Sequence, residues 1–442
     1  MSAAPDQEKT GLGNYFIANY PPFSFWKGET LPEATAALNR PPVPGTPLGL
    51  YLHIPFCRKR CKFCYFRVYT DKNAKDVTTY TDALLKEVEL LAKTPCVGGR
   101  HLDYVYFGGG TPSYLSADQL RGLMTRLKEI MPWDQAREVA FECEPGTLQK
   151  HKLEALKELG VTRLSLGVEN FKPEILQFNG RAHLEDEVYR AYGWAREVGF
   201  DQINIDLIAG MVGEDWDNWK DCVAKTIKLD PECVTVYQME LPYNTTFSKE
   251  LQMVGDDAPA IPLSIADWPT KRAWTQYAFD EFVKAGYEVT SATTVMKDRT
   301  KTHFVYREAL WTGADMFGTG VASFGHVSGV HIQNVDTWEA YIDKLNRDEL
   351  PLGRAFVTTG RDRLIREMIL QLKTGHLERD YFQKKFDTDI VEEFRAGYDK
   401  LQAEGMLTVG ENAIETTPAG LLQIDRHLTA FFDPQYVGKR YT

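Results

Sequence analysis

The chain has 442 residues, 43% of them hydrophobic, and a net charge of −11 at pH 7. This length accommodates one large domain and a smaller one, and the acidic balance argues against a general nucleic-acid-binding surface. No apolar run approaches the length that spans a bilayer, and the polar first residues lack the apolar core of a secretion signal. Seven cysteines, a small and odd number, favour a reducing, cytoplasmic location over a disulfide framework.

Residues 1–47 are rich in proline, glycine and aromatic side chains, and we expect them to form an N-terminal arm and a stiff linker. From Leu48 onward, strand and helix patterns alternate. The candidate strands are 48–54, 103–107, 137–142, 162–167, 202–208, 233–239 and 286–291. The helical patterns between them lie at 76–93, 117–131, 148–159, 184–198, 214–229 and 266–284.

Several of these strands are continuous apolar runs, which suits a parallel sheet that is covered on both faces. Repeated βα units form either a doubly wound sheet or a barrel, and both place function at the C-terminal ends of the strands. We therefore predict an α/β domain over residues 48–335.

After residue 335 helical patterns dominate, at 336–346, 361–373, 378–386 and 389–404, and a short hairpin pattern follows at 405–417. Helices that precede a hairpin are typical of a winged-helix-like module. We expect residues 336–442 to form such an α-rich C-terminal domain. The acidic charge of the chain favours packing or substrate cover over DNA binding as its role.

Three cysteines, Cys57, Cys61 and Cys64, follow the first strand at spacings of four and three residues. A closed structural zinc or iron–sulfur site has four protein ligands. Three thiolates on one loop can hold a four-iron cluster and leave one iron open to a small molecule. The alternative is a zinc knuckle with a remote fourth ligand.

Polar groups and glycines lie at or just beyond the ends of the later strands, as Gly108–Thr111, Glu142, Glu169, Asp206 and Glu240. Glycines let a ligand approach the backbone closely, although a triple glycine is often only a turn. Asp206 lies inside an apolar run, so a structural ion pair is the alternative to a binding role. The alternative for Arg181 is a surface arginine.

The C-x3-C-x2-C spacing, with Phe63 before the last cysteine and His53-Ile54-Pro55-Phe56 before the first, resembles the radical SAM superfamily. Within it, the chain resembles the oxygen-independent coproporphyrinogen III oxidase family. Relatives of that family include haem chaperones and radical SAM C-methylating enzymes. The resemblance implies a partial (β/α)6-type barrel, a [4Fe–4S] cluster on the three cysteines, and one or two molecules of S-adenosylmethionine (SAM). The cluster and SAM would generate a 5′-deoxyadenosyl radical that removes hydrogen from the substrate.

The resemblance also implies roles for single residues. The glycine motif would contact the methionine part of SAM, and Glu142, Arg181 and Asp206 match SAM-contacting positions. The turn Gly318–Phe324 matches a segment near which a second SAM can bind. The full set of implied cofactor-binding residues is Tyr51, Phe63, Gly109, Gly110, Thr111, Glu142, Glu169, Arg181, Asp206, Glu240 and Phe324.

The chain departs from the family pattern at three places. Phe66 replaces a further cysteine of the decarboxylating oxidases, Glu169 replaces a usual glutamine, and 306–311 lacks the His-Asn pair of the chaperones. Three functions stay open: oxidative decarboxylation of porphyrinogen propionates, C-methylation or cyclopropanation with a second SAM, and haem delivery. No catalytic residue is assigned.

The cysteine loop carries a basic run, Arg58-Lys59-Arg60, which Lys62 and Arg67 extend. In an acidic protein this local positive charge could dock an electron donor such as flavodoxin or ferredoxin. It could instead attract a carboxylate-rich tetrapyrrole, or simply be a solvated loop face.

Overall fold

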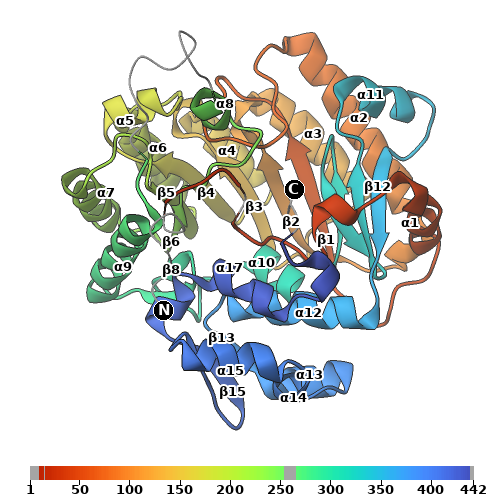
Figure 1. Ribbon diagram of the computed structural model, residues 1–442. Coiled ribbons are helices and arrows are strands. Elements are labelled where there is room, and N and C mark those ends of the chain that lie inside the picture. The colour runs from red at the N-terminus through yellow and green to blue at the C-terminus, as the bar shows by residue number, and fades with distance from the viewer. Residues whose placement is uncertain (1–8, 14, 253–264, 439–442) are drawn as a thin grey trace. The chain divides into compact units, whose positions relative to one another are not determined.

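The computed structural model describes residues 9–13, 15–252 and 265–438 (Figure 1). The chain forms two compact units. The larger unit consists of Trp26–Asp206 and His303–Val357, and the smaller unit consists of Met1–Phe25, Leu207–Thr302 and Thr358–Thr442. Each unit therefore combines segments that are far apart in the sequence.

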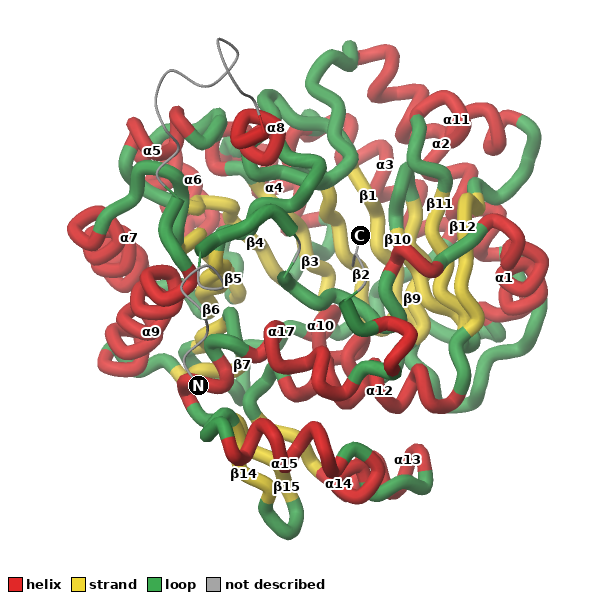
Figure 2. Tube along the Cα trace, in the orientation of Figure 1, coloured by secondary structure: helices red, strands yellow, loops and turns green. Residues whose placement is uncertain are grey.

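The larger unit is built on one mixed sheet, whose strands lie side by side in Figure 2. The strand order is β12-β11-β10-β9-β1-β2-β3-β4-β5, and β1 is parallel to both β2 and β9. Strands β2, β3 and β4 continue the parallel part, whereas β10, β11 and β12 are antiparallel. The bounds are Leu48–Ile54 (β1), Leu102–Gly109 (β2), Glu138–Cys143 (β3), Arg163–Glu169 (β4), Gln202–Ala209 (β5), Asp315–Thr319 (β9), Phe324–Val327 (β10), Val330–Asn334 (β11) and Leu352–Val357 (β12).

Helices alternate with the parallel strands along the chain. In α2, Tyr80, Leu84, Val88 and Leu91 recur every three to four residues and are buried, which is the pattern of a helix with one face on a core. Asn73 caps α2 and Ser116 caps α3, each in a reciprocal capping box. The helices of this unit are Leu31–Leu38 (α1), Ala74–Ala92 (α2), Ala117–Ile130 (α3), Lys150–Glu158 (α4), Pro173–Phe178 (α5), Glu185–Val198 (α6), Val305–Trp311 (α10) and Trp338–Asn346 (α11).

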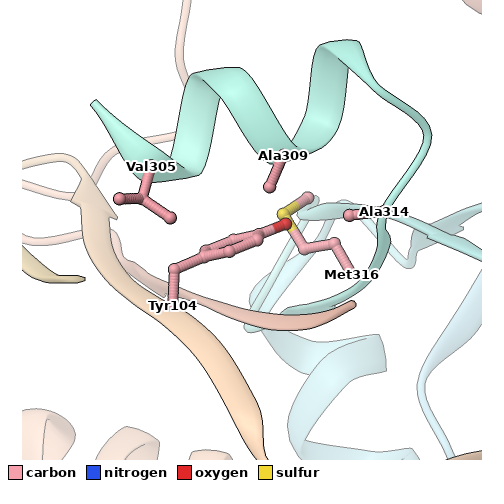
Figure 3. Close-up of a cluster of buried hydrophobic side chains, with 5 residues drawn as sticks. All are labelled: Tyr104, Val305, Ala309, Ala314 and Met316. Atoms are coloured by element: carbon pink, nitrogen blue, oxygen red, sulfur yellow. The ribbon is translucent and has the colours of Figure 1, made fainter. Parts of the chain in front are cut away.

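Helix α10 packs on the parallel sheet through a small apolar cluster. Val305 and Ala309 point from α10 toward the ring of Tyr104 on β2, beside Met316 of β9 (Figure 3). Gly49 of β1 leaves the space for this ring, since a Cβ there would lie 1.9 Å from it. This packing fixes α10 next to β2 and so positions Tyr306, which reaches the candidate site.

The smaller unit contains the antiparallel strands β6-β8-β7 and a separate antiparallel sheet, β13-β15-β14. Its strands are Cys233–Gln238 (β6), Glu288–Ser291 (β7), Thr294–Met296 (β8), His376–Glu378 (β13), Leu407–Val409 (β14) and Ala413–Thr416 (β15). Its helices are Trp216–Leu229 (α7), Thr246–Gln252 (α8), Trp268–Lys284 (α9), Gly360–Leu372 (α12), Arg379–Phe386 (α13), Ile390–Glu393 (α14), Arg395–Ala403 (α15), Pro418–Leu421 (α16) and Ile424–His427 (α17). The helices α12–α15 followed by the β14–β15 hairpin match the order that the sequence predicts.

The α/β class with its parallel βα units is confirmed. The strands β8–β13 and the helix α1 inside the expected linker were not predicted, because they are short and several carry buried polar side chains such as His326, His331 and Gln333. The domain bounds 1–47, 48–335 and 336–442 stay a prediction, and residues 1–8 and 14 of the arm lie outside the described residues.

Candidate active site

The three cysteines of the loop after β1 form the centre of the candidate site. All seven cysteines of the chain are free, and Cys57, Cys61 and Cys64 are partly buried, whereas the other four are fully buried. In the described part of the chain, no three His, Cys, Asp or Glu side chains could share one metal ion. A four-iron cluster does not need this arrangement, because each cysteine ligates a different iron.

Each of the three sulfur atoms has a hydrogen-bond donor close by. The Thr111 hydroxyl donates to Cys57 Sγ at 3.4 Å, and Arg181 Nη1 donates to Cys61 Sγ at 3.4 Å. A backbone hydrogen bond from Phe66 serves Cys64. Burial nevertheless raises the pKa of the Cys57 thiol to about 11 and that of Cys64 to about 12. A positive cluster would compensate the cost of these buried thiolates.

The loop is anchored to the ends of the neighbouring elements. Arg58 pairs with the buried Glu144 after β3, with Nε–Oε2 and Nη2–Oε1 distances of 3.2 and 2.5 Å. The backbone N–H of Lys62 donates to the Asn179 carbonyl at 3.0 Å. Gly180 lies against the loop, since a Cβ there would be 3.1 Å from the Lys62 nitrogen. These contacts hold the three thiols on one rigid turn.

The glycine motif runs directly along the end of β1. The Gly110 N–H donates to the Ile54 carbonyl at 2.9 Å, and Gly109 has a φ of +113°. A Cβ at Gly109 would lie 2.4 Å from His53 Nδ1, so no other residue fits without displacing that ring. The motif therefore forms an open backbone cradle beside the cysteine loop.

Three carboxylates lie close to one another, two of them at the ends of β3 and β4 and the third, Asp206, inside β5. Glu142 accepts the Tyr106 hydroxyl at 2.7 Å and the Gly109 N–H at 3.2 Å. Burial, together with the negative charge of Asp206, raises the pKa values of Glu142 and Glu169 to about 7. Asp206 itself accepts hydrogen bonds from Ser165 and Asn204, each at 2.9 Å. Such a cluster of acids is unfavourable alone and suits a cationic ligand.

Arg181 connects this acidic group to the cysteine loop. Besides its bond to Cys61, it lies 3.7 Å from Glu169 Oε1 and donates to the Gly167 carbonyl. Among the residues that the structure describes, its buried Nε atom has no hydrogen-bond partner. An unpartnered buried N–H is costly, and a ligand carboxylate would satisfy it. SAM requires acidic side chains for its amino group and a hydrogen-bond donor for its carboxylate, and a [4Fe–4S] cluster requires three thiols. The candidate site contains all of these groups.

The other implied residues have different surroundings. Tyr51 stacks on Tyr106 with 5.9 Å between ring centroids and shares a 3.3 Å hydrogen bond with His53, whereas Phe63 lies half-buried on the loop. Glu240 belongs to the smaller unit, where it accepts the Tyr15 N–H at 3.1 Å and burial raises its pKa to about 7.

Phe324 follows a turn that a buried glutamate holds. Glu87 of α2 accepts the Gly320 N–H at 2.8 Å, the Tyr341 hydroxyl at 2.6 Å and the Asn334 amide at 2.6 Å. Burial raises the pKa of Glu87 to about 7. The ring of Phe324 itself lies edge-on to Trp26 at 5.5 Å.

Sequence reasoning missed Tyr106, Tyr306 and the Arg58–Glu144 pair. Tyr106 donates a hydrogen bond to Glu142, and its ring lies tilted against that of Tyr306 with 4.3 Å between ring centroids. The alternation of β2 was the available signal for Tyr106, because it places this residue on the same face as Gly108. The partners of Arg58 and Tyr306 depend on tertiary packing and left no signal in the sequence.

Known families and proteins include relatives of this chain. Residues 51–225 match the model of the radical SAM superfamily, a match that includes all three cysteines and Arg181. The protein is a radical SAM oxidoreductase, whose cofactors are a [4Fe–4S] cluster and SAM. In the described residues, no helix is long and apolar enough to cross a membrane.

The relatives narrow the class further. The chain is 28% identical to the oxygen-independent coproporphyrinogen III oxidase of Synechocystis over 96% of this chain and 92% of that protein. It is 29% identical to the heme chaperone HemW of Bacillus subtilis over 84% of this chain and 96% of that protein. The fold matches the solved structure of the Escherichia coli coproporphyrinogen III oxidase HemN, with a TM-score of 0.79, 24% identity, and 94% and 96% of the two chains covered. Within the superfamily, the chain is thus similar over most of its length to coproporphyrinogen III oxidases and to a heme chaperone.

Proposed function

We propose that this protein oxidatively decarboxylates the propionate side chains of a porphyrinogen, as a coproporphyrinogen dehydrogenase of porphyrin and haem biosynthesis. The observation that carries the proposal is the similarity to the Synechocystis oxidase, which extends over 96% of this chain. The hydrogen bonds from Thr111 and Arg181 to the cysteine sulfurs support the cofactors named in this proposal. The buried Arg181 Nε, which has no hydrogen-bond partner in the described residues, supports them as well.

The residues of the larger unit then have the following roles. Cys57, Cys61 and Cys64 ligate three irons of the cluster. When bound, the cluster and SAM supply a 5′-deoxyadenosyl radical that removes hydrogen from the substrate. Arg181 would donate its Nε–H to the SAM carboxylate, and Glu142 would accept a hydrogen bond from the SAM amino group. The remaining proposed cofactor-binding residues are Tyr51, Phe63, Gly109, Gly110, Thr111, Glu169, Asp206, Phe324 and, from the resemblance alone, Glu240.

The test is a reaction with defined components under exclusion of oxygen. The protein is reconstituted with iron and sulfide and incubated with SAM, a reductant and coproporphyrinogen III, and the products are followed by mass spectrometry. We expect loss of carbon dioxide together with 5′-deoxyadenosine. The control variant Cys61→Ser should lose the four-iron cluster and SAM cleavage, because one ligand is missing. A variant that kept both would contradict the assignment of the loop.

Two other outcomes would replace the proposed activity. Formation of S-adenosylhomocysteine beside 5′-deoxyadenosine would identify a C-methyltransferase or cyclopropanase that uses a second SAM. Stable haem binding without turnover would identify a haem chaperone, the function in the name of the Bacillus subtilis relative.

The proposal includes a partner and a location. An acidic electron donor such as flavodoxin or ferredoxin would dock on the cysteine loop. There Tyr65 and Phe66 are 44% and 46% exposed and stack with 4.6 Å between their centroids, beside the exposed Lys59 and Arg60. Seven free cysteines support a cytoplasmic location.

A further inference from the structure

The hydrogen bonds to the cysteine sulfurs come from three separate parts of the larger unit. Thr111 lies just beyond β2, Arg181 lies beyond α5, and Phe66 belongs to the loop itself. Loop-backbone donors accompany any tight cysteine turn. A hydroxyl and a guanidinium from other elements require that the surrounding fold place them there.

Thr111 is the more informative of the two side-chain donors, because it is held rigidly and has one acceptor. The residue is 9% exposed, and its carbonyl accepts the Tyr114 N–H at 2.8 Å. In the described part of the chain, Cys57 Sγ is the only acceptor of its hydroxyl. The neighbouring Gly110 donates a hydrogen bond to Ile54 at the end of β1, which connects the segment after β2 to the start of the cysteine loop.

We propose that the Thr111 hydroxyl sets the reduction potential of the iron–sulfur cluster through its hydrogen bond to the Cys57 sulfur, and that Arg181 does the same through Cys61. The inference rests on the cluster of the proposed function and is independent of the substrate. Thr111 is a positioning residue in this role, because it acts on the cluster through a ligand.

The direction of the effect follows from charge. Reduction adds one electron and no proton to the unit of cluster and thiolates, so negative charge on the sulfurs increases. A donor to a sulfur stabilises the more negative, reduced form more than the oxidised form, and hydrogen bonds to the sulfurs are among the groups that set such potentials. Removal of the donor should therefore lower the midpoint potential and make the cluster harder to reduce.

The experiment compares two substitutions that differ only in the hydroxyl. Thr111→Val keeps the shape and removes the donor, whereas Thr111→Ser keeps the donor. Both are reconstituted without oxygen and titrated with titanium(III) citrate in the absence of SAM, and the reduced cluster is counted by electron paramagnetic resonance. We expect the equilibrium constant for reduction to fall about tenfold in Thr111→Val, a shift of about 59 mV for one electron. Thr111→Ser should stay near the wild type.

Two control measurements show whether a changed potential comes from the lost hydrogen bond or from an incomplete cluster. Iron and sulfide contents show whether each variant holds a full cluster, and an unchanged midpoint in a fully loaded Thr111→Val would overturn the proposal. If Thr111→Val does not bind the cluster, resonance Raman spectra of the wild type test the hydrogen bond instead. The Fe–S(Cys) stretching frequencies of the wild type should shift in D₂O, and Thr111→Ala should lose part of that shift. Fe–S stretches that do not respond to D₂O would also overturn it. The cluster potential and the Raman frequencies do not depend on whether the protein decarboxylates coproporphyrinogen. The proposed function and the proposed role of Thr111 can therefore be refuted independently.

Discussion

At the scale of single residues, the pair Tyr106–Glu142 governs the charge of the candidate site. Burial raises the pKa of Glu142 to about 7, while the Tyr106 hydroxyl, which donates to Glu142 Oε1, lowers it. Glu142 is thus only partly ionised near neutral pH. The affinity for a cationic amino group should then rise as the pH rises through about 7.

The substitution Tyr106→Phe should shift this dependence upward. A hydrogen bond to a charged group contributes about 1.5–3 kcal/mol, and 1.36 kcal/mol corresponds to one pKa unit, so we expect a shift of about 1–2 units. SAM binding to the cluster-loaded protein, measured by calorimetry between pH 6 and 9, should weaken about tenfold at pH 7. Tyr104→Phe, two residues earlier on the same strand, is the control. Identical profiles for Tyr106→Phe and the wild type would refute the role of the hydroxyl.

At the scale of elements, a single buried carboxylate connects α2, α11 and the turn before β10. Three donors surround Glu87: the Gly320 N–H, the Tyr341 hydroxyl and the Asn334 amide. Even so, burial dominates and raises the pKa of Glu87 from 4.5 to about 7. A raised carboxyl pKa contributes stability that is fully present below the unfolded value and is lost as the pH rises through the folded value.

Glu87→Gln should remove this pH dependence, because the amide does not titrate. Between pH 5 and pH 8 the free energy of unfolding should change in favour of the variant, relative to the wild type, by on the order of 3 kcal/mol. Urea unfolding of both proteins across this range measures the difference. Glu89→Gln on the same helix, at a partly exposed position, should follow the wild type. Parallel curves for Glu87→Gln and the wild type would show that Glu87 keeps an ordinary pKa.

The elements also show how far sequence reasoning reaches. The bounds of β1–β5 and of α2–α4 and α6 were predicted to within two residues, because continuous apolar runs and helical periodicity are local properties. The antiparallel strands β10 and β11 were not predicted, because they bury His326 and His331, whose Nδ1 atoms lie 2.8 Å apart. Burial of these side chains depends on packing that no local pattern reveals.

In the candidate site, too, features that depend on local patterns were predicted, whereas features that depend on tertiary packing were not. Glu142, Glu169 and Asp206 were predicted to lie together because the C-terminal ends of adjacent parallel strands meet at one edge of a sheet. Tyr106 was not assigned to Glu142, because that pairing depends on the register between β2 and β3. The bonds from Thr111 and Arg181 to sulfur depend on distances of a few tenths of an ångström, which spacing in the sequence does not encode.

At the scale of the whole molecule, the cysteine loop has a charge opposite to that of the chain. The net charge is −11, yet Arg58, Lys59, Arg60 and Lys62 fall within five consecutive positions around the second cysteine. Complementary patches accelerate association, and salt screens this effect beyond about 10 Å at 0.1 M. The exposed Lys59 is the position at which this charge can be reversed with the least structural change.

Reduction of the cluster by an acidic flavodoxin should therefore depend on salt. We expect the rate at limiting donor to fall about fivefold between 50 and 500 mM sodium chloride, and to be lower at low salt in Lys59→Glu. The control Lys284→Glu makes the same charge change on α9 and should behave as the wild type. A rate without salt dependence would exclude docking by charge on this loop.

Segments of the two units alternate along the sequence, and this order affects how the protein folds during synthesis on the ribosome. Strand β1 pairs on one side with β2 but on the other with β9, and Leu207–Thr302 of the smaller unit is made between them. At about 5–20 residues per second, one edge of β1 waits roughly 15–50 s for its partner. An unpaired strand edge is a template for mispairing with another chain. The nascent chain is thus most vulnerable along the strand that leads directly into the three cysteines, and a chaperone that shields this edge would protect the cluster loop before any iron arrives.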